Sequence, residues 1–166
     1  MAAISDPKPP PSQTSEPPAL AVADELALQR LASRYWALAD GTEEFAIPEL
    51  FTADGVLELG SLRLEGVEAI HRFFVEREKA NKAAGRVTRH LASGFLIVPL
   101  SSERVRVRST VIVHAGNGEL PIEVSLPSGI ADFEDICVRS DNGDWLYRSR
   151  VARTVFVGPA AASFAR

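Results

Sequence analysis

A long alternating pattern in the second half of the chain constrains the fold most. Arginine and valine alternate over residues 104–108, and the valines continue at 111 and 113. Alternation of polar and apolar residues is typical of a strand with one buried face. Similar patterns predict strands over residues 87–100, 130–139 and 145–157, and the turn 141–144 joins the last two. The second half therefore forms a sheet of long strands.

The first half of the chain has helical spacing instead. Apolar residues recur every two to four positions and predict three helices, over residues 24–40, 43–51 and 67–84. Gly41 and Gly85 are the stop signals of the first and third helices, because glycine readily ends a helix.

Shorter elements connect these helices and strands. A turn is expected at Thr52–Gly55, followed by short strands over 56–59 and 62–64, and a further short strand is expected over 122–126. Three helices followed by long strands indicate an α+β fold with helices on one face of an antiparallel or mixed sheet. Long strands curve, and a strongly curved sheet closed by helices on its concave side encloses a pocket for a small apolar molecule.

Composition limits the domain organisation. The chain has 166 residues, of which 46% are hydrophobic, so we expect one folded domain over residues 19–158. Residues 1–18 hold six of the eleven prolines and almost no large aliphatic residue, which predicts a disordered tail. Residues 159–166 are assigned to a C-terminal tail.

Charge and motifs narrow the partners. A net charge of −4 argues against nucleic acid or an anionic membrane as partner, which leaves a small molecule or a protein. Neither a secretory signal nor a membrane span is apparent, so we expect a cytoplasmic protein. The single cysteine, Cys137, is predicted to be a small apolar strand residue. No ligand spacing indicates a metal, and no cofactor is expected.

An aspartate and a histidine are the first candidates for chemistry. Asp40 precedes Gly41 at a helix C-terminus, where the helix dipole is unfavourable for a carboxylate, so it requires a partner. His90 shares strand parity with the small residues Thr88 and Ala92, which leave room in front of its ring. The alternatives are an exposed turn residue for Asp40 and a half-buried histidine bonded to a backbone carbonyl for His90.

Other residues give weaker signals. Tyr35 and Trp36 lie one turn before Asp40 and contact a substrate or simply form core. His71 is expected on the surface. Arginines on two strands, among them Arg108 and Arg150, either form a salt-bridge face with Glu134 or Asp135, or place one arginine in the pocket to bind an anionic group.

Five segments together carry a family resemblance: RYWALADGTEEF, TADGVLELG, GVEAIHRFF, VTRHLASG and DNGDWLYRSRVARTVF. Over about residues 20–157 the chain resembles the SnoaL-like branch of the nuclear-transport-factor-2-like (NTF2-like, cystatin-like) superfamily. The resemblance implies a cone-shaped α+β fold around a deep pocket, as in polyketide cyclases and scytalone dehydratase.

The resemblance also implies roles for individual residues. In the dehydratases a tyrosine, an aspartate and a histidine act on the substrate, and Tyr35, Asp40 and His90 match them in order and context. Trp36 and Phe133 are expected to line the pocket, as is His114, which corresponds to a second histidine of scytalone dehydratase.

The leading hypothesis is a cofactor-independent lyase or dehydratase, cyclase or isomerase that acts on a small, apolar carbonyl or hydroxy compound. The alternative is a non-catalytic module of the same fold that binds a ligand or serves as a scaffold, because fold does not establish chemistry. An epoxide hydrolase is disfavoured, since its Asp-Arg-Asp arrangement cannot be placed. A homodimer through the outer face of the sheet is expected.

Overall fold

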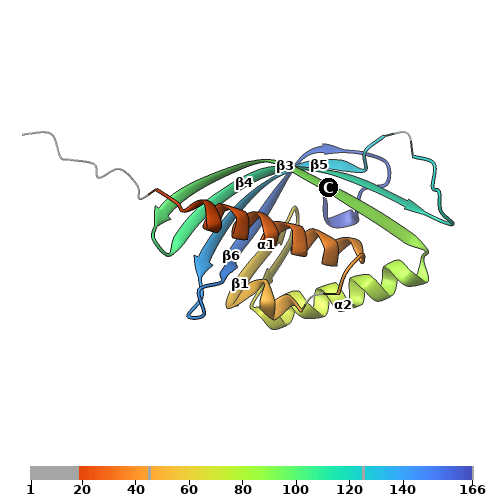
Figure 1. Cartoon of the computed structure of the whole chain (residues 1–166). Coiled ribbons are helices and arrows are strands. Elements are labelled where there is room, and N and C mark those ends of the chain that lie inside the picture. The colour runs from red at the N-terminus through yellow and green to blue at the C-terminus, as the bar shows by residue number, and fades with distance from the viewer. Residues whose placement is uncertain (1–18, 45, 125, 166) are drawn as a thin grey trace, which may run out of the picture.

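The computed structural model describes residues 19–44, 46–124 and 126–165, and the predicted N-terminal tail, 1–18, lies outside them. Within these residues two α-helices, α1 (Val22–Asp40) and α2 (Val67–Ala83), lie on one side of a six-stranded sheet (Figure 1). This arrangement is the predicted α+β fold.

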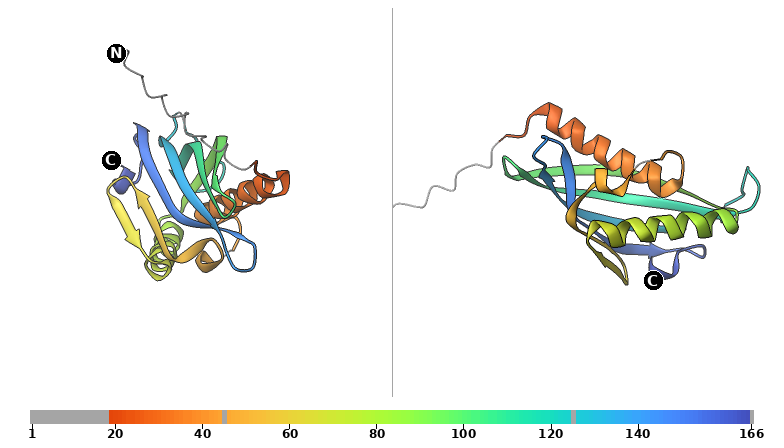
Figure 2. Two further views of the ribbon diagram at one scale, coloured as in Figure 1. Left: turned by 90° about the vertical axis from the view of Figure 1, so that its left-hand side faces the viewer. Right: turned by 90° about the horizontal axis from the view of Figure 1, so that it is seen from below.

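The sheet is mixed and strongly curved. Its strands, in spatial order, are β2 (Leu62–Glu65), β1 (Phe51–Leu59), β6 (Trp145–Val157), β5 (Gly129–Arg139), β4 (Arg104–Asn117) and β3 (Arg86–Ser101). Only the β1–β6 pair is parallel. The long strands β3, β4 and β5 arch over both helices, which leaves the concave face toward α1 and α2 (Figure 2). The four strands predicted in the second half are confirmed within a residue or two at each end, except that β4 continues to Asn117.

The prediction of three helices is wrong. Of the segment 43–51, the described residues form only a short 3-10 helix, η1 (Ile47–Glu49). The chain must extend after Leu50, because the Tyr147 amide donates to the Leu50 carbonyl at 2.8 Å and Phe51 pairs with Tyr147 at the start of β1. Sheet pairing and burial of Phe51 therefore override the local helical pattern.

Two shorter elements also differ from expectation. The predicted turn 52–55 lies inside β1, where the register against β6 shifts between Phe51 and Val56. Such a bulge accommodates turn-forming residues within a strand. No strand forms at 122–124 or 126, the described part of the expected strand 122–126.

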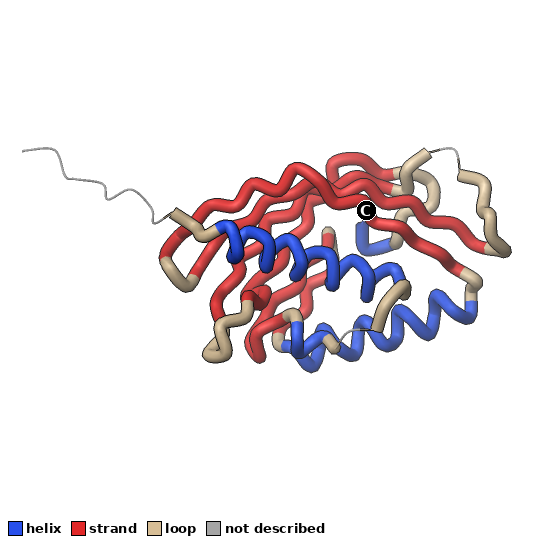
Figure 3. The backbone as a smooth tube through the Cα atoms, in the orientation of Figure 1, coloured by secondary structure: helices blue, strands red, loops and turns tan. Residues whose placement is uncertain are grey.

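The C-terminal segment folds back under the sheet. A 3-10 helix, η2 (Ser163–Ala165), follows β6 on the helix side of the sheet (Figure 3). The Ser61 amide donates to the Phe164 carbonyl at 3.0 Å, and the Phe164 ring lies 6.0 Å from that of Phe73 on α2. The described residues of the segment assigned to a tail, 159–165, thus contact the folded domain.

A buried ion pair lies in the core between α1 and the sheet. Arg150 on β6 is fully buried, and its Nη1 donates to Asp135 on β5 at 3.1 Å. The Arg150 guanidinium lies 4.1–4.7 Å from four ring centroids, those of Tyr35, Trp36, Phe133 and Tyr147. Burial raises the pKa of Asp135 to about 6, although the charge of Arg150 opposes the rise. The exposed pair Arg108–Glu134, in contrast, matches the predicted salt-bridge face.

Removal of the buried cation is expected to destabilise the fold. Arg150→Met leaves the Asp135 carboxylate buried without a counter-ion, and we expect a loss of about 3–5 kcal/mol at pH 7. In the variant the charge of Arg150 no longer opposes the effect of burial, so the pKa of Asp135 rises further. On acidification the folded variant therefore binds a proton at Asp135 before the unfolded chain does, and the loss should shrink at pH 5. Urea unfolding at both pH values measures these effects.

The matched control is Arg148→Gln on the same strand. Arg148 pairs with Asp54, but its side chain is 42% exposed, so this substitution should cost about 1 kcal/mol or less. Equal losses in the two variants would contradict the importance of the buried pair.

Candidate active site

Asp40 connects the end of α1 to the start of β3. The helix ends at Gly41, whose φ of 65° is the left-handed conformation that glycine adopts readily. The Asp40 carboxylate accepts hydrogen bonds from the backbone amide of His90 and from the hydroxyl of Thr88, both at 2.9 Å. Its Oδ1 also lies 2.5 Å from Nδ1 of His90. His90, the partner predicted for Asp40, therefore contacts it in the structure.

The ring of His90 is held on two sides. Asp40 bonds its Nδ1, and the indole of Trp36 stacks on its face, with centroids 4.6 Å apart and planes 19° from parallel. Both side chains of the Asp40–His90 pair are largely buried, with exposures of 8% and 13%. Trp36 in turn contacts Phe133 edge to face at 5.2 Å. The imidazole is thus fixed in position and orientation.

Electrostatics determine the protonation of the pair. Burial raises the pKa of Asp40, but the hydrogen bond and charge of His90, its backbone amide and the Thr88 hydroxyl together lower that pKa below the usual value. Asp40 is therefore ionised at neutral pH and can only accept. Nδ1 of His90 is therefore the ring nitrogen that carries a hydrogen toward Asp40, and Nε2 lies on the far side of the ring.

An apolar space, which we call the inner cavity, lies beside His90. It has a volume of about 110 Å³ and also borders Arg77, Val113, Ala131 and Thr154. Six further aromatic side chains line it: Tyr35, Trp36, Phe73, Phe74, Phe133 and Phe164. An apolar cavity of 150 Å³ binds benzene, so the inner cavity takes on the order of one ring.

A larger and more polar depression, the outer groove, lies on the other side of the pair. It has a volume of about 1080 Å³ and runs between the end of α1 with the residues that follow it (38–44), one face of α2, and residues 85–89 at the start of β3. Asp40 borders the outer groove, whereas His90 borders the inner cavity. Ala39, Phe74 and Arg77 border both spaces, so they form the partition between them.

The structure brings together five of the six predicted site residues. Tyr35, Trp36, His90 and Phe133 line the inner cavity, and Asp40 contacts His90. His114 lies elsewhere: it pairs with Arg89 across β3 and β4, on the sheet face opposite to His90 and Val113. Because neighbouring strand residues point to opposite faces, we leave His114 out of the site.

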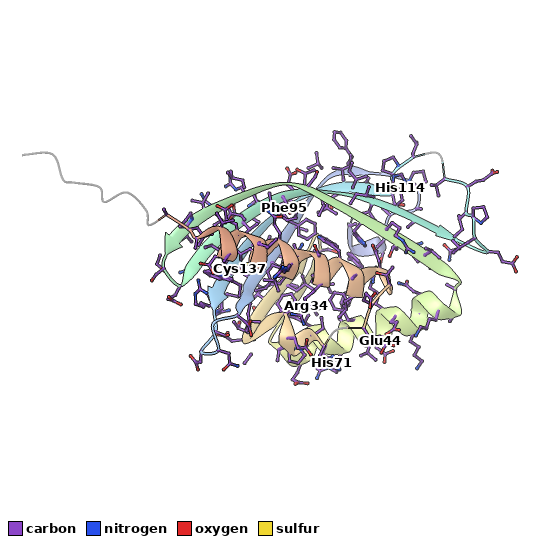
Figure 4. All side chains as sticks on the ribbon, viewed as in Figure 1. Arg34, Glu44, His71, Phe95, His114 and Cys137 are labelled. Carbon is purple, nitrogen blue, oxygen red and sulfur yellow. The ribbon has the colours of Figure 1, made fainter. Side chains whose placement is uncertain are left out.

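Figure 4 marks His114 on the sheet and His71 on α2, at opposite sides of the fold. His71 is exposed, as predicted, at the rim of the outer groove. Cys137 is a buried residue of β5, also as predicted, and burial raises the pKa of its thiol.

Among the lining residues that sequence reasoning missed, Arg77 and Phe164 bear most on the site. Arg77 belonged to a recognised helical pattern, but nothing in that pattern indicated that its side chain reaches the site. Phe164 lies in the segment assigned to a tail, although an isolated aromatic residue near a chain end is a weak signal for packing.

Within the described ranges, no three His, Cys, Asp or Glu side chains are arranged to hold a metal ion. None of the described helices has the length and apolar character of a membrane span.

The hydroxyl of Thr88 should help to keep Asp40 ionised. Thr88→Val removes one hydrogen bond to the carboxylate at nearly constant volume, so the pKa of Asp40 should rise. A pH titration of the Asp40 carboxyl carbon by NMR measures the change. Thr154→Val, at a cavity residue outside the Asp40 hydrogen bonds, is the control, and an equal effect of both variants would contradict the assignment.

Comparisons with known proteins agree with this fold. ActVI-ORFA from Streptomyces coelicolor superposes with a TM-score of 0.69 at 18% identity, over 84% of this chain and all of that chain. A Novosphingobium aromaticivorans protein provisionally named scytalone dehydratase gives a TM-score of 0.64 at 22% identity, over 87% of this chain and 95% of that chain. A Catenulispora acidiphila protein, in complex with S-DNPA, gives a TM-score of 0.63 at 21% identity, over 81% of this chain and 95% of that chain.

A search of curated protein sequences gives no significant match. The structural likeness, at these identities, concerns the fold alone, and a further neighbour from Nostoc punctiforme is described as having a cystatin-like fold. The sequence model of the SnoaL-like domain, however, matches residues 21–151, which include α1, α2 and nearly all of the sheet. The chain therefore belongs to the SnoaL-like domain family.

Proposed function

We propose that this protein is a cofactor-independent acid–base enzyme, a dehydratase, cyclase or isomerase for a small apolar carbonyl or hydroxy compound. The observation that carries the proposal is the Asp40–His90 pair, with Oδ1 and Nδ1 2.5 Å apart at the wall of an apolar cavity. An ionised carboxylate that orients an imidazole produces a general base at neutral pH.

His90 is the proton-transferring residue in this mechanism. Its Nε2 removes an acidic proton from the carbon next to a carbonyl, and Asp40 stabilises the imidazolium that forms. In the dehydratase version, the imidazolium returns the proton to the departing hydroxyl, and water leaves. Stacking on Trp36 keeps the ring in one plane through both transfers.

Tyr35 is proposed to stabilise the enolate oxygen. Burial raises the pKa of its phenol, with the charges of Arg150 and Arg77 opposing the rise, so the hydroxyl is protonated at neutral pH and can donate. A donor aimed at developing negative charge typically lowers the activation free energy by about 3 kcal/mol. The ring of Tyr35 borders the same cavity as His90, as this role requires.

The alternative remains a module that binds a ligand without reaction. Such a module needs the cavity but not an ordered, ionised partner for His90. The three hydrogen-bonding contacts on Asp40 favour the enzyme, because binding of an apolar molecule does not depend on them.

Proton exchange tests the mechanism without knowledge of the natural substrate. In D₂O the protein should accelerate exchange of the protons next to the carbonyl in acetophenone or related ketones with one ring, followed by NMR. His90→Ala should lower the rate about 10²–10⁴-fold, because it removes the base. Asp40→Asn and Tyr35→Phe should each lower it by at least about tenfold.

His71→Ala is the matched control, since His71 is exposed and lies outside the inner cavity. Its exchange rate should equal that of the wild type. Saturable binding of the ketones with exchange at the buffer rate in every protein would support the binding module instead.

We also propose that two copies of the chain pair through the outer face of the sheet. Four apolar side chains lie in one row across it, because β3–β6 pair in the register Leu91, Ile112, Ile130 and Phe156. The residues at the two ends of the row, Leu91 and Phe156, are 55% and 63% exposed. A row of this kind can bury its exposed apolar area against the same row of a second copy.

Phe156→Glu should convert a dimer to a monomer, because it places a charge in this row. Size-exclusion chromatography with light scattering measures the mass. Leu26→Glu, on the exposed side of α1, should leave the dimer intact. A monomeric wild type, or dissociation of both variants, would contradict the proposed interface.

A further inference from the structure

Arg77 is a half-buried cation in the partition between the inner cavity and the outer groove. Its Nη1 donates to the Ala39 carbonyl, in the last turn of α1, at 2.5 Å. Among the described residues no carboxylate lies within ion-pair distance of Arg77, whereas Arg63, Arg108, Arg139, Arg148 and Arg150 each contact one. The guanidinium therefore has hydrogen-bonding capacity left for another acceptor.

A second arginine lies close to the first. Arg86, at the start of β3, also borders the outer groove, and its side chain donates to the Ala160 carbonyl at 2.8 Å and to Asn117 Oδ1 at 3.4 Å. It too has no ion-pair partner within the described ranges. Burial lowers the pKa of Arg77, the charges of Tyr35 and Asp40 oppose this, and the charge of Arg86 adds to the lowering. Two neighbouring cations of this kind are stabilised by an anion that contacts them.

The acidic side chains nearby do not supply this anion. Asp40 is engaged by His90 and Thr88, and Glu78 pairs with Lys82. Glu43 and Glu44 border the same groove, but neither lies within 4.0 Å of a basic group of Arg77 or Arg86. The remaining candidate is an acidic group on a bound molecule.

The sizes of the two spaces limit what that molecule is. The inner cavity of about 110 Å³ holds on the order of one ring beside His90. Anything larger must pass the partition at Arg77 and continue into the outer groove. A group attached to the ring thus meets a guanidinium at the point where it leaves the cavity.

We propose that Arg77, assisted by Arg86, is an anion-binding subsite, and that the substrate is a compound with one aromatic ring and a carboxylate side arm. The ring lies in the inner cavity, and the carboxylate accepts hydrogen bonds from the Arg77 guanidinium at the partition. This inference rests on the proposed function for the position of the reacting carbon beside His90, but not for the binding of the acid.

A matched pair of ligands tests the subsite. Phenylacetate and phenylacetamide have nearly the same shape and differ in charge, and isothermal titration calorimetry measures their affinities. The wild type should bind the acid at least about tenfold more tightly than the amide, as expected for hydrogen bonds to a charged group. In Arg77→Gln this preference should disappear through weaker binding of the acid, with the affinity of the amide unchanged.

Three further variants exclude a purely structural role. Arg77→Lys keeps the charge and should keep part of the preference, whereas a residue needed only to cap α1 would show no dependence on ligand charge. Arg86→Gln should reduce the preference less than Arg77→Gln. Arg72→Gln, on an exposed position of the same helix, should bind both ligands as the wild type does.

Equal affinity of the wild type for acid and amide, absence of saturable binding of the acid, or an unchanged preference in Arg77→Gln would each overturn the subsite. These outcomes are separable from failure of the proposed function. If His90→Ala retains full proton exchange while Arg77→Gln loses its preference for the acid, the mechanism is wrong and the subsite stands.

Discussion

The hydrogen bonds of one carboxylate organise the candidate site. Asp40 lies at the negative end of α1, an unfavourable place for a charge, and the amide of His90 and the hydroxyl of Thr88 compensate for it. The same contacts join the end of the helix to the first residues of the long strand β3. Because the imidazole is bound to the same carboxylate, the position of the base depends on how α1 packs against the sheet.

The parts of this site that follow from periodicity could be predicted from sequence. Strand parity places His90 on the same face as Thr88, and the helix dipole indicates that Asp40 requires a partner. Parity also excludes His114, but only once the register of β4 is known, and a shift of one residue exchanges the two faces of a strand. The family resemblance could not resolve this register.

Long-range pairing accounts for what the sequence did not show. The segment before Phe51 has a helical pattern, yet its pairing with Tyr147, almost a hundred residues away, forces an extended chain. The burial of Arg150 likewise depends on four aromatic rings from α1 and the sheet, which no local pattern brings together. The sequence presented Arg150 as one arginine among several on two strands, and only the tertiary structure distinguishes it from the exposed Arg108.

The two arginines near the site contribute in different ways because their surroundings differ. Arg150 is enclosed by aromatic rings and bound to Asp135, so its charge is compensated within the protein, and it also opposes the rise in the pKa of Tyr35. Among the described residues, Arg77 has a backbone carbonyl as its one hydrogen-bond partner, and it borders both spaces of the site, so its remaining hydrogen-bonding capacity is available to a ligand. A buried charge with an internal partner stabilises the shape of the cavity, whereas a partly buried charge without one selects what enters it.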